Sequence, residues 1–140
     1  MEHRLDEAIE WYRKSIDIHP TAEAHTFLGW VLSFQKRWED AIVECKTAIR
    51  VDPEFGNPYN DIGAYLIELG RPDEAIEWLE RAKRAARYEP RHFPYFNLSR
   101  IYVMRHKIPE AIRELRAAVE LAPDYVAARR ELHRLIGMLN

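Results

Sequence analysis

The chain has 140 residues, 47% of them hydrophobic, which is enough to build the core of one ordinary domain. Its charges nearly cancel to a formal −2, so it lacks the basic surplus that favours binding to nucleic acid or anionic membranes. One cysteine excludes an intramolecular disulfide, no apolar run approaches the roughly 20 residues of a membrane-spanning helix, and the first ten residues do not resemble a secretory signal. These features favour a cytoplasmic protein.

A repeated pattern runs along the chain. In its first complete copy, Leu28 is followed by the small Gly29, then by Ala41 13 residues after Leu28, by Ala48 seven residues later, and by Pro53. The same intervals between an apolar residue, a small residue and two alanines recur downstream. We therefore divide the chain into a leading half-repeat at 5–20, full repeats at 22–53, 56–90 and 92–123, and a closing helix at 126–139.

Each full repeat predicts two amphipathic helices, because apolar residues recur at steps of three and four and Pro with Asp marks the joins. The small residues Gly29, Gly63 and Ser99 are expected where paired helices cross closely. In repeat 56–90, the interval from the second alanine to the closing proline is three residues longer than in the other repeats. We expect these residues to lengthen the second helix by nearly one turn through Lys83–Ala86.

The closing helix differs at the small-residue position, which His133 occupies. A side chain of this size would collide with a following helix, so the segment is expected to cap the array. Charged neighbours give the cap a polar face, as terminal repeats require: they are Arg129, Arg130, Glu131 and Arg134.

The segment "AEAHTFLGWVLSFQKRWEDAIVECKTAIRVDP" resembles the tetratricopeptide repeat, a pattern of about 34 residues. The segments "YNDIGAYLIELGRPDEAIEWLERA" and "YFNLSRIYVMRHKIPEAIRELRAA" repeat the same order of residues. The resemblance implies an all-α fold, a right-handed α-solenoid of stacked antiparallel helix pairs that forms a single domain over 1–140. It also implies a protein–protein interaction scaffold that binds a peptide segment of its partner in a concave groove.

The resemblance further implies that the first helix of each repeat lines this groove. At 100° per residue, Trp30 lies on the side of its helix opposite the residues that pack within the hairpin. The predicted groove has an aromatic end, an amide-rich middle and a basic end. Together these suit a peptide with apolar and acidic groups. Alternatively, Phe27, Phe34, Phe93 and Phe96 only pack against neighbouring repeats. By register, the expected groove residues are Phe27, Trp30, Phe34, Asn57, Asn60, Asp61, Asn97, Arg100, Met104, Arg130 and Arg134.

Family members that hold the acidic tails of heat-shock chaperones share a clamp of two lysines, two asparagines and an arginine. The resemblance places five residues of this chain at the clamp positions, and none of them is basic. We therefore expect no chaperone-tail binding here. The residues are Thr26, Trp30, Asp61, Phe93 and Asn97.

A basic cluster supports an alternative function, nucleic-acid binding, because related pentatricopeptide repeats bind RNA. Its cations lie between Arg81 and Arg91, with Tyr88 beside them, but Glu80 and Glu89 flank it and the net charge is negative. Nucleic acid is thus the less favoured partner. The cations are Arg81, Lys83, Arg84, Arg87 and Arg91.

The N-terminal helix presents an apolar stripe of Leu5, Ile9, Tyr12 and Ile16. No first helix precedes it in the sequence, so we expect the stripe to be uncovered and to pair with a second copy as a two-fold homodimer. Alternatively, this helix frays and leaves a monomer.

No chemistry of an enzyme is evident in the sequence. The six histidines form no i, i+4 pair and have no cysteine partner at a metal-ligand interval, so we expect no metal site. Cys45 lies on the inward face of its helix and is expected to be an inert buried thiol. No glycine-rich phosphate loop exists. We accordingly expect no catalytic residues and no cofactor.

Overall fold

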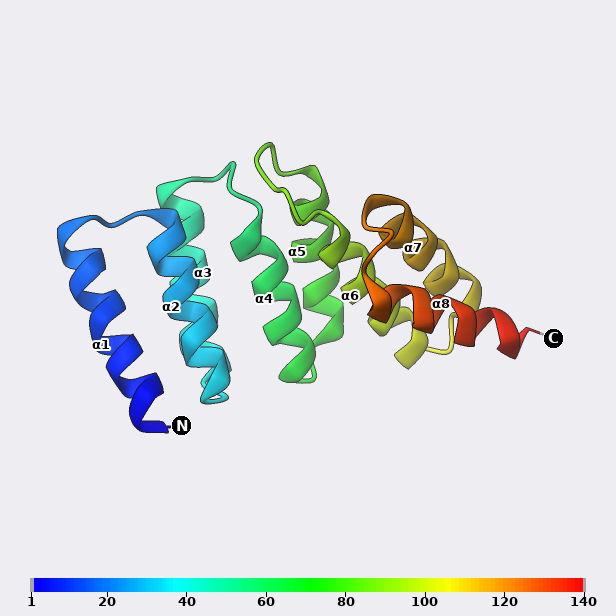
Figure 1. Ribbon diagram of the computed structural model, residues 1–140, viewed down its shortest axis with the longest axis horizontal. Coiled ribbons are helices and arrows are strands. Elements are labelled where there is room, and N and C mark those ends of the chain that lie inside the picture. Colours follow the sequence, from blue (N-terminus) through cyan, green and yellow to red (C-terminus); the bar gives the residue numbers. More distant parts are fainter. Residues whose placement is uncertain (1, 140) are drawn as a thin grey trace. The chain divides into compact units, whose positions relative to one another are not determined.

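The computed structural model describes residues 2–139, and its regular structure is α-helical apart from one isolated β-bridge (Figure 1). The expected all-α fold is confirmed. In chain order, the helices of the described residues are α1 (Glu2–Ile18), α2 (Ala22–Phe34), α3 (Trp38–Val51), α4 (Asn57–Glu68), α5 (Pro72–Arg84), α6 (His92–Met104), α7 (Ile108–Leu121) and α8 (Val126–Met138).

The chain folds as two compact units, one ending at Tyr88 and one beginning at Glu89. In unit 1, the helix pairs α2–α3 and α4–α5 form antiparallel hairpins, as Figure 1 shows. Helix α1 packs on α2, α3 packs on α4, and α2 also contacts α4 directly. In unit 2, α6 pairs with α7, and α8 packs on α7. None of the described helices is long and apolar enough to span a bilayer.

Close helix crossings occur where the small residues predict them. A Cβ atom built on Gly29 would lie 3.0 Å from the carbonyl oxygen of Ala41, and one on Gly63 would overlap the Leu79 side chain. Ser99, at the same position of unit 2, has no exposed surface. The second helices turn a fully buried row toward these crossings, made of Ala41, Cys45, Ala48, Ala75, Leu79, Ala82, Ala111, Leu115 and Ala118.

Each hairpin turns through one residue with positive φ, at the same position of every full repeat. These residues are Lys36 (φ 58°), Gly70 (φ 74°) and His106 (φ 59°). In the first hairpin, the Lys36 N–H donates to the Ser33 carbonyl at 2.9 Å, and the next N–H donates to the Leu32 carbonyl at 3.2 Å. This left-handed residue satisfies the last carbonyls of the first helix and reverses the chain.

The extra residues of repeat 56–90 do not lengthen its second helix. Helix α5 ends at Arg84, and Ala85 has extended backbone (φ −62°, ψ 139°), so the expected helical turn through Lys83–Ala86 is wrong. A segment rich in Ala, Lys and Arg has high helix propensity, but propensity is weaker than tertiary contacts. Here the extended backbone after Arg84 gains hydrogen-bond partners in another segment of the chain.

Those partners lie in the connection between α3 and α4. Arg87 forms a parallel β-bridge with Phe55. Its N–H donates to the Glu54 carbonyl at 2.9 Å, and its carbonyl accepts from the Gly56 N–H at 3.0 Å. Tyr88 is buried, and a Cβ on Gly56 would overlap its ring. The added segment therefore holds the α3–α4 connection in place.

The apolar stripe of α1 was expected to be uncovered, but the structure shows that it is largely covered. Ile9 is only 8% exposed, while Leu5, Tyr12 and Ile16 are half-buried. The ring of Tyr12 stacks on that of Phe27, with 6.0 Å between ring centroids. In a helical repeat, a second helix packs on the first helix of the following repeat as well as on its own partner. Helix α2 supplies that cover.

Two positions of α1 are less covered than the corresponding positions of α3. Ala8 and Tyr12 are half-buried, whereas Ala41 and Cys45 at the same positions of α3 have no exposed surface. Trp11, which precedes Tyr12, is 69% exposed.

Candidate functional site

The aromatic side chains of α2 form the most exposed apolar surface of the predicted groove. Phe27, Trp30 and Phe34 are each about half exposed, at 51%, 50% and 54%. The rings of Trp30 and Phe34 meet edge to face, with 4.6 Å between centroids. We call these three residues the α2 aromatic patch.

The alternative that the phenylalanines only pack inside the protein fits unit 2 better than unit 1. Phe93 and Phe96 meet Tyr125 edge to face, with centroids 5.6 Å and 5.4 Å apart. Phe27 contacts Tyr12 but keeps half of its surface exposed. The exposed aromatic part of the predicted groove therefore lies mainly on α2.

A polar cluster lies where α2, α3 and α4 meet, and we define the Asp61 cluster as Ser33, Asp61 and Tyr65. The side chain of Asn60 donates to Asp61, which is close enough to Tyr65 and Cys45 to raise the pKa of each. The Tyr65 ring lies 5.8 Å from Trp38. The cluster thus sits beside the aromatic patch, because Trp30 and Ser33 are adjacent on the surface of α2.

Asp61 is an unusual carboxyl group. It remains partly exposed, yet the surrounding protein removes enough water to raise its pKa to about 7. The hydrogen bond from Asn60 opposes this shift only in part. Asp61 pairs with no basic side chain among residues 2–139. Near neutral pH it therefore exists as a mixture of acid and carboxylate.

The hydroxyl of Tyr65 is buried and makes no hydrogen bond of standard geometry within the described residues. The Ser33 hydroxyl is near enough to lower the pKa of Tyr65, but burial first, and then Asp61, raise that pKa far more. Ser33 itself donates to the Trp30 carbonyl at 2.5 Å. Because the Ser33 proton is already committed to that carbonyl, the tyrosine oxygen keeps unused hydrogen-bonding capacity.

The asparagines predicted to line the middle of the groove are mostly engaged within the protein. Asn60 and Asn97 are 7% and 8% exposed, while Asn57 is half-buried. Asn97 Oδ1 accepts from Arg100 at 3.1 Å. Little amide surface at Asn60 and Asn97 remains for the backbone of a peptide.

The predicted basic residues of unit 2 differ in availability. Arg134 is exposed but forms a bidentate ion pair with Glu131. Arg100 is half-buried, and Met104 is 52% exposed. Arg130 lines a hollow of about 630 Å³ formed by α8 and Val119 of α7. Among these arginines, Arg130 offers the most open cation.

The cations of the predicted nucleic-acid cluster are largely used within unit 1. The Arg81 guanidinium lies over the rings of Trp78 and Tyr59, at 4.7 Å and 5.0 Å, and Lys83 pairs with Glu80 at 3.1 Å. Arg84 is exposed at a hollow of about 320 Å³ that also contains Glu54.

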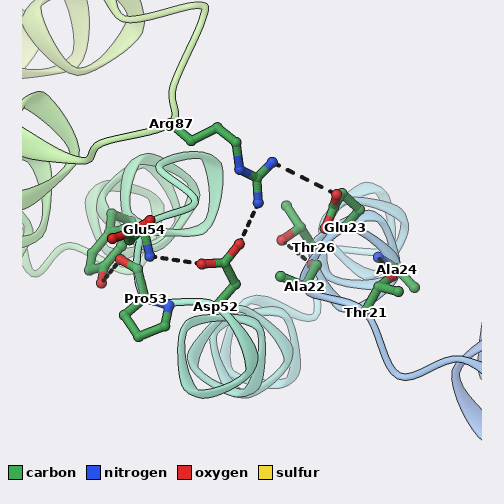
Figure 2. Close-up of polar contacts among 10 residues, drawn as sticks. Thr21, Ala22, Glu23, Ala24, Thr26, Asp52, Pro53, Glu54 and Arg87 are labelled. Carbon is green, nitrogen blue, oxygen red and sulfur yellow. Dashed lines mark hydrogen bonds and ion pairs between the residues drawn. The ribbon is translucent and has the colours of Figure 1, made fainter.

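Arg87 reaches from the segment after α5 to two acidic residues (Figure 2). It pairs with Asp52, which follows α3, and with Glu23 of α2 at 3.8 Å. Hydrogen bonds from Arg87 and from the Glu54 N–H hold the pKa of Asp52 below its usual value. These contacts connect three parts of unit 1 and leave Arg87 little freedom to bind a phosphate.

Cys45 is fully buried. Burial raises the pKa of its thiol well above the usual value, and the negative charges of Asp61 and Glu44 add to that effect. The reactive thiolate is therefore strongly disfavoured at neutral pH. Among residues 2–139, no three His, Cys, Asp or Glu side chains gather in a metal-binding arrangement.

The sequence pattern predicts the α2 aromatic patch but not the Asp61 cluster. Register places Asp61 in the groove, yet Tyr65 and Ser33 carry no signal of a polar site, because each fits an ordinary helix position. A carboxyl group and a tyrosine four residues apart lie on one helix face, and this spacing was the available indication.

Comparison with known proteins identifies one family. The family model described as "Tetratricopeptide repeat" matches residues 54–124. A curated relative from Mycosarcoma maydis, the small glutamine-rich tetratricopeptide repeat-containing protein 2, is 35% identical over 72 residues. That alignment covers 50% of this chain and 20% of the relative.

Solved structures of similar fold cover nearly the whole chain. PilF of Pseudomonas aeruginosa superposes with a TM-score of 0.87 at 23% identity, over 98% of this chain and 62% of that chain. A thermophilic repeat protein of Thermus thermophilus, TTC0263, gives 0.79 at 20% identity, over 96% and 74%. YrrB, described as having an unusual peptide-binding site, gives 0.68 at 21%, over 97% and 70%. At these identities the similarity shows an all-α helical repeat.

Proposed function

The chain belongs to the tetratricopeptide repeat family, whose members generally act as protein–protein interaction scaffolds, and we propose that it binds a peptide segment of a partner protein along α2 and α4. The observation that carries this proposal is the α2 aromatic patch. Phe27, Trp30 and Phe34 lie half exposed on a first helix, the helix that lines the groove in this family. Monomeric proteins rarely leave clustered aromatic rings in water without a binding role.

The patch can supply useful binding energy. An aromatic side chain carries about 150–250 Å² of surface, so covering the exposed half of one ring contributes on the order of 2–3 kcal/mol at about 25 cal/mol per Å². Two such rings would anchor a short peptide, since association itself costs several kcal/mol. An apolar or aromatic side chain is the group that fits here.

We further propose that an acidic group of the partner pairs with Arg100 or Arg130 in unit 2. Arg134 is the weakest of the predicted cations, because Glu131 already occupies its guanidinium. The nucleic-acid alternative has less support than it had from sequence, since Arg81, Lys83 and Arg87 make contacts within the protein.

Self-association through α1 stays a prediction, but the structure changes which surface of α1 is available for it. Ile9 is covered by α2 and Tyr12 stacks on Phe27, so the surface to test is the exposed Trp11 with its neighbour Ala8. A Trp11→Ala variant that lowers the sedimentation coefficient at tens of micromolar would support a dimer. A monomer for both proteins would reject it.

Affinity capture from native lysate tests the peptide-binding proposal. The bait is the intact protein, beside a Trp30→Ala/Phe34→Ala variant and a control variant, Val43→Ala/Val51→Ala. The control removes exposed apolar surface of α3, where the valines are 56% and 47% exposed. We expect partners that the control retains and the patch variant loses. Partners retained equally by both variants would contradict the proposal.

A further inference from the structure

We propose that the Asp61 cluster receives the cationic group of the bound peptide, the ammonium of a lysine or the guanidinium of an arginine, next to the apolar residue held by Trp30. This inference rests on the proposed peptide-binding function and specifies one chemical feature of the peptide.

The carboxyl group of Asp61 lacks a counter-charge within residues 2–139. Asp61 sits among apolar and neutral groups with no basic partner in the described residues, and only Asn60 donates to it. Removing a carboxylate from water without an opposite charge is unfavourable, and folded proteins keep such groups mainly where they serve a function. A cation supplied by the ligand would complete the pair.

The hydroxyl of Tyr65 supports the same site independently of charge. The Tyr65 oxygen is buried without a hydrogen-bond partner, one helical turn from Asp61. A phenolic oxygen can accept a hydrogen bond, and both ammonium and guanidinium carry several donors. One cation could therefore pair with Asp61 while bringing hydrogen-bond donors toward the Tyr65 oxygen.

Trp30 adds an aromatic surface to this site. Its ring is 50% exposed, and Trp30 precedes by three residues Ser33, the α2 residue close enough to Tyr65 to affect its pKa. An indole face attracts cations, and Arg or Lys beside Trp is a favourable pairing. The carboxyl and the indole thus offer complementary surfaces to one basic side chain.

The surrounding titratable groups do not provide the cation themselves. From α3, Cys45 and Glu44 face this region, and from α2, His25 pairs with Glu44 at 3.0 Å. Cys45 and Tyr65 stay protonated near neutral pH because their pKa values are raised. Changes in cation binding between pH 6 and 8 should therefore follow Asp61.

The experiment selects peptides from a randomised display library on the full chain, on Asp61→Asn, and on Glu10→Gln as a control that neutralises an exposed carboxylate of α1. Asparagine keeps the size of the side chain, and circular dichroism checks that each variant folds. We expect Lys or Arg to be enriched beside an apolar residue on the wild type and the control but not on Asp61→Asn.

Synthetic peptides then measure the effect at the enriched position. Replacing its Lys or Arg by Gln should weaken binding to the wild type about tenfold or more, as loss of a charge-assisted bond does. The same replacement should change binding to Asp61→Asn little. Affinity for the basic peptide should rise from pH 6 to 8, also in His25→Gln, and stay flat in Asp61→Asn.

The outcomes separate this inference from the proposed function. Peptides that are selected without basic residues, or that bind Asp61→Asn equally well, overturn the cation site and leave peptide binding intact. If no peptide is selected, the proposed function fails, and n-butylammonium chloride becomes the probe. A fall in the pKa of Asp61, measured by NMR against equal sodium chloride, would support the cation site, and an unchanged pKa would overturn it.

Discussion

At the scale of single residues, the Asp61 carboxyl should reduce the stability of the folded protein above neutral pH. Its folded pKa of about 7 exceeds the usual value of 3.8, so the folded state binds more protons than the unfolded state between these limits. The contribution of Asp61 to the unfolding free energy is therefore lost as pH rises from about 4 to 7. Ionising it in place is unfavourable.

Asp61→Asn should consequently stabilise the protein at pH 8, by about 2–4 kcal/mol, and change it little at pH 4, because each pKa unit corresponds to about 1.4 kcal/mol. Urea denaturation of both proteins at the two pH values measures this difference. Comparison with the variant matters, since carboxylates with lowered pKa, such as Glu131 beside Arg134, lose their contribution as pH falls. Equal stability at pH 8 would show that Asp61 is not desolvated.

Two leucine substitutions at equivalent positions should differ sharply. Gly63→Leu places a side chain against Leu79, where even a Cβ overlaps, so we expect a loss of about 3 kcal/mol or more. His133→Leu alters an exposed position and should change the unfolding free energy by less than about 0.5 kcal/mol. Thermal or urea unfolding of both variants gives the comparison. Similar losses would mean that the small-residue position is not a helix crossing in unit 1.

At the scale of helices and turns, the hairpin turns contain removable strain. His106 and Lys36 adopt positive φ, where a side chain costs about 1 kcal/mol, whereas Gly70 holds the same position without that cost. His106→Gly should therefore stabilise the protein by a few tenths to about 1 kcal/mol, and Gly70→Ala should destabilise it by a similar amount. Changes of the same sign in the two variants, measured by urea denaturation, would contradict a left-handed turn at this position.

Helix pairs and crossings could be predicted because they depend on local spacing. The interval from Leu28 to Ala41 reflects the length of one hairpin, and Gly29 marks the closest contact of its two helices. Both features can therefore be predicted from the sequence. The segment after Arg84 could not be predicted, because its conformation depends on Glu54 and Gly56, about 30 residues earlier. The cover of Ile9 likewise depends on which face of α1 meets α2.

The candidate site could likewise be predicted only where it depends on the spacing of residues within one helix. Register placed Phe27, Trp30 and Phe34 on an outward face, and they are exposed. Register could not tell that Asn60 and Asn97 are buried, or that Asp61 lacks a counter-ion, because burial and pairing depend on side chains from other helices.

At the scale of the whole molecule, the two units carry different chemistry. Unit 1 offers exposed aromatic rings and an uncompensated carboxyl, and unit 2 offers arginines, among them the exposed Arg130. A partner of unit 1 would thus carry apolar and basic groups, and a partner of unit 2 would carry acidic groups. Since tetratricopeptide repeats serve many processes, the identity of a partner must come from the site and not from the fold.

The most direct test of the central claim is the dissociation constant of the captured partner's binding segment for wild type, Trp30→Ala and Val43→Ala, by fluorescence anisotropy. Trp30 and Val43 are both about half exposed, on α2 and α3. We predict that Trp30→Ala weakens binding about tenfold or more, the factor given by roughly 1.4 kcal/mol, while Val43→Ala leaves it unchanged. Unchanged affinity in Trp30→Ala, or equal losses in both variants, would contradict peptide binding by the α2 aromatic patch.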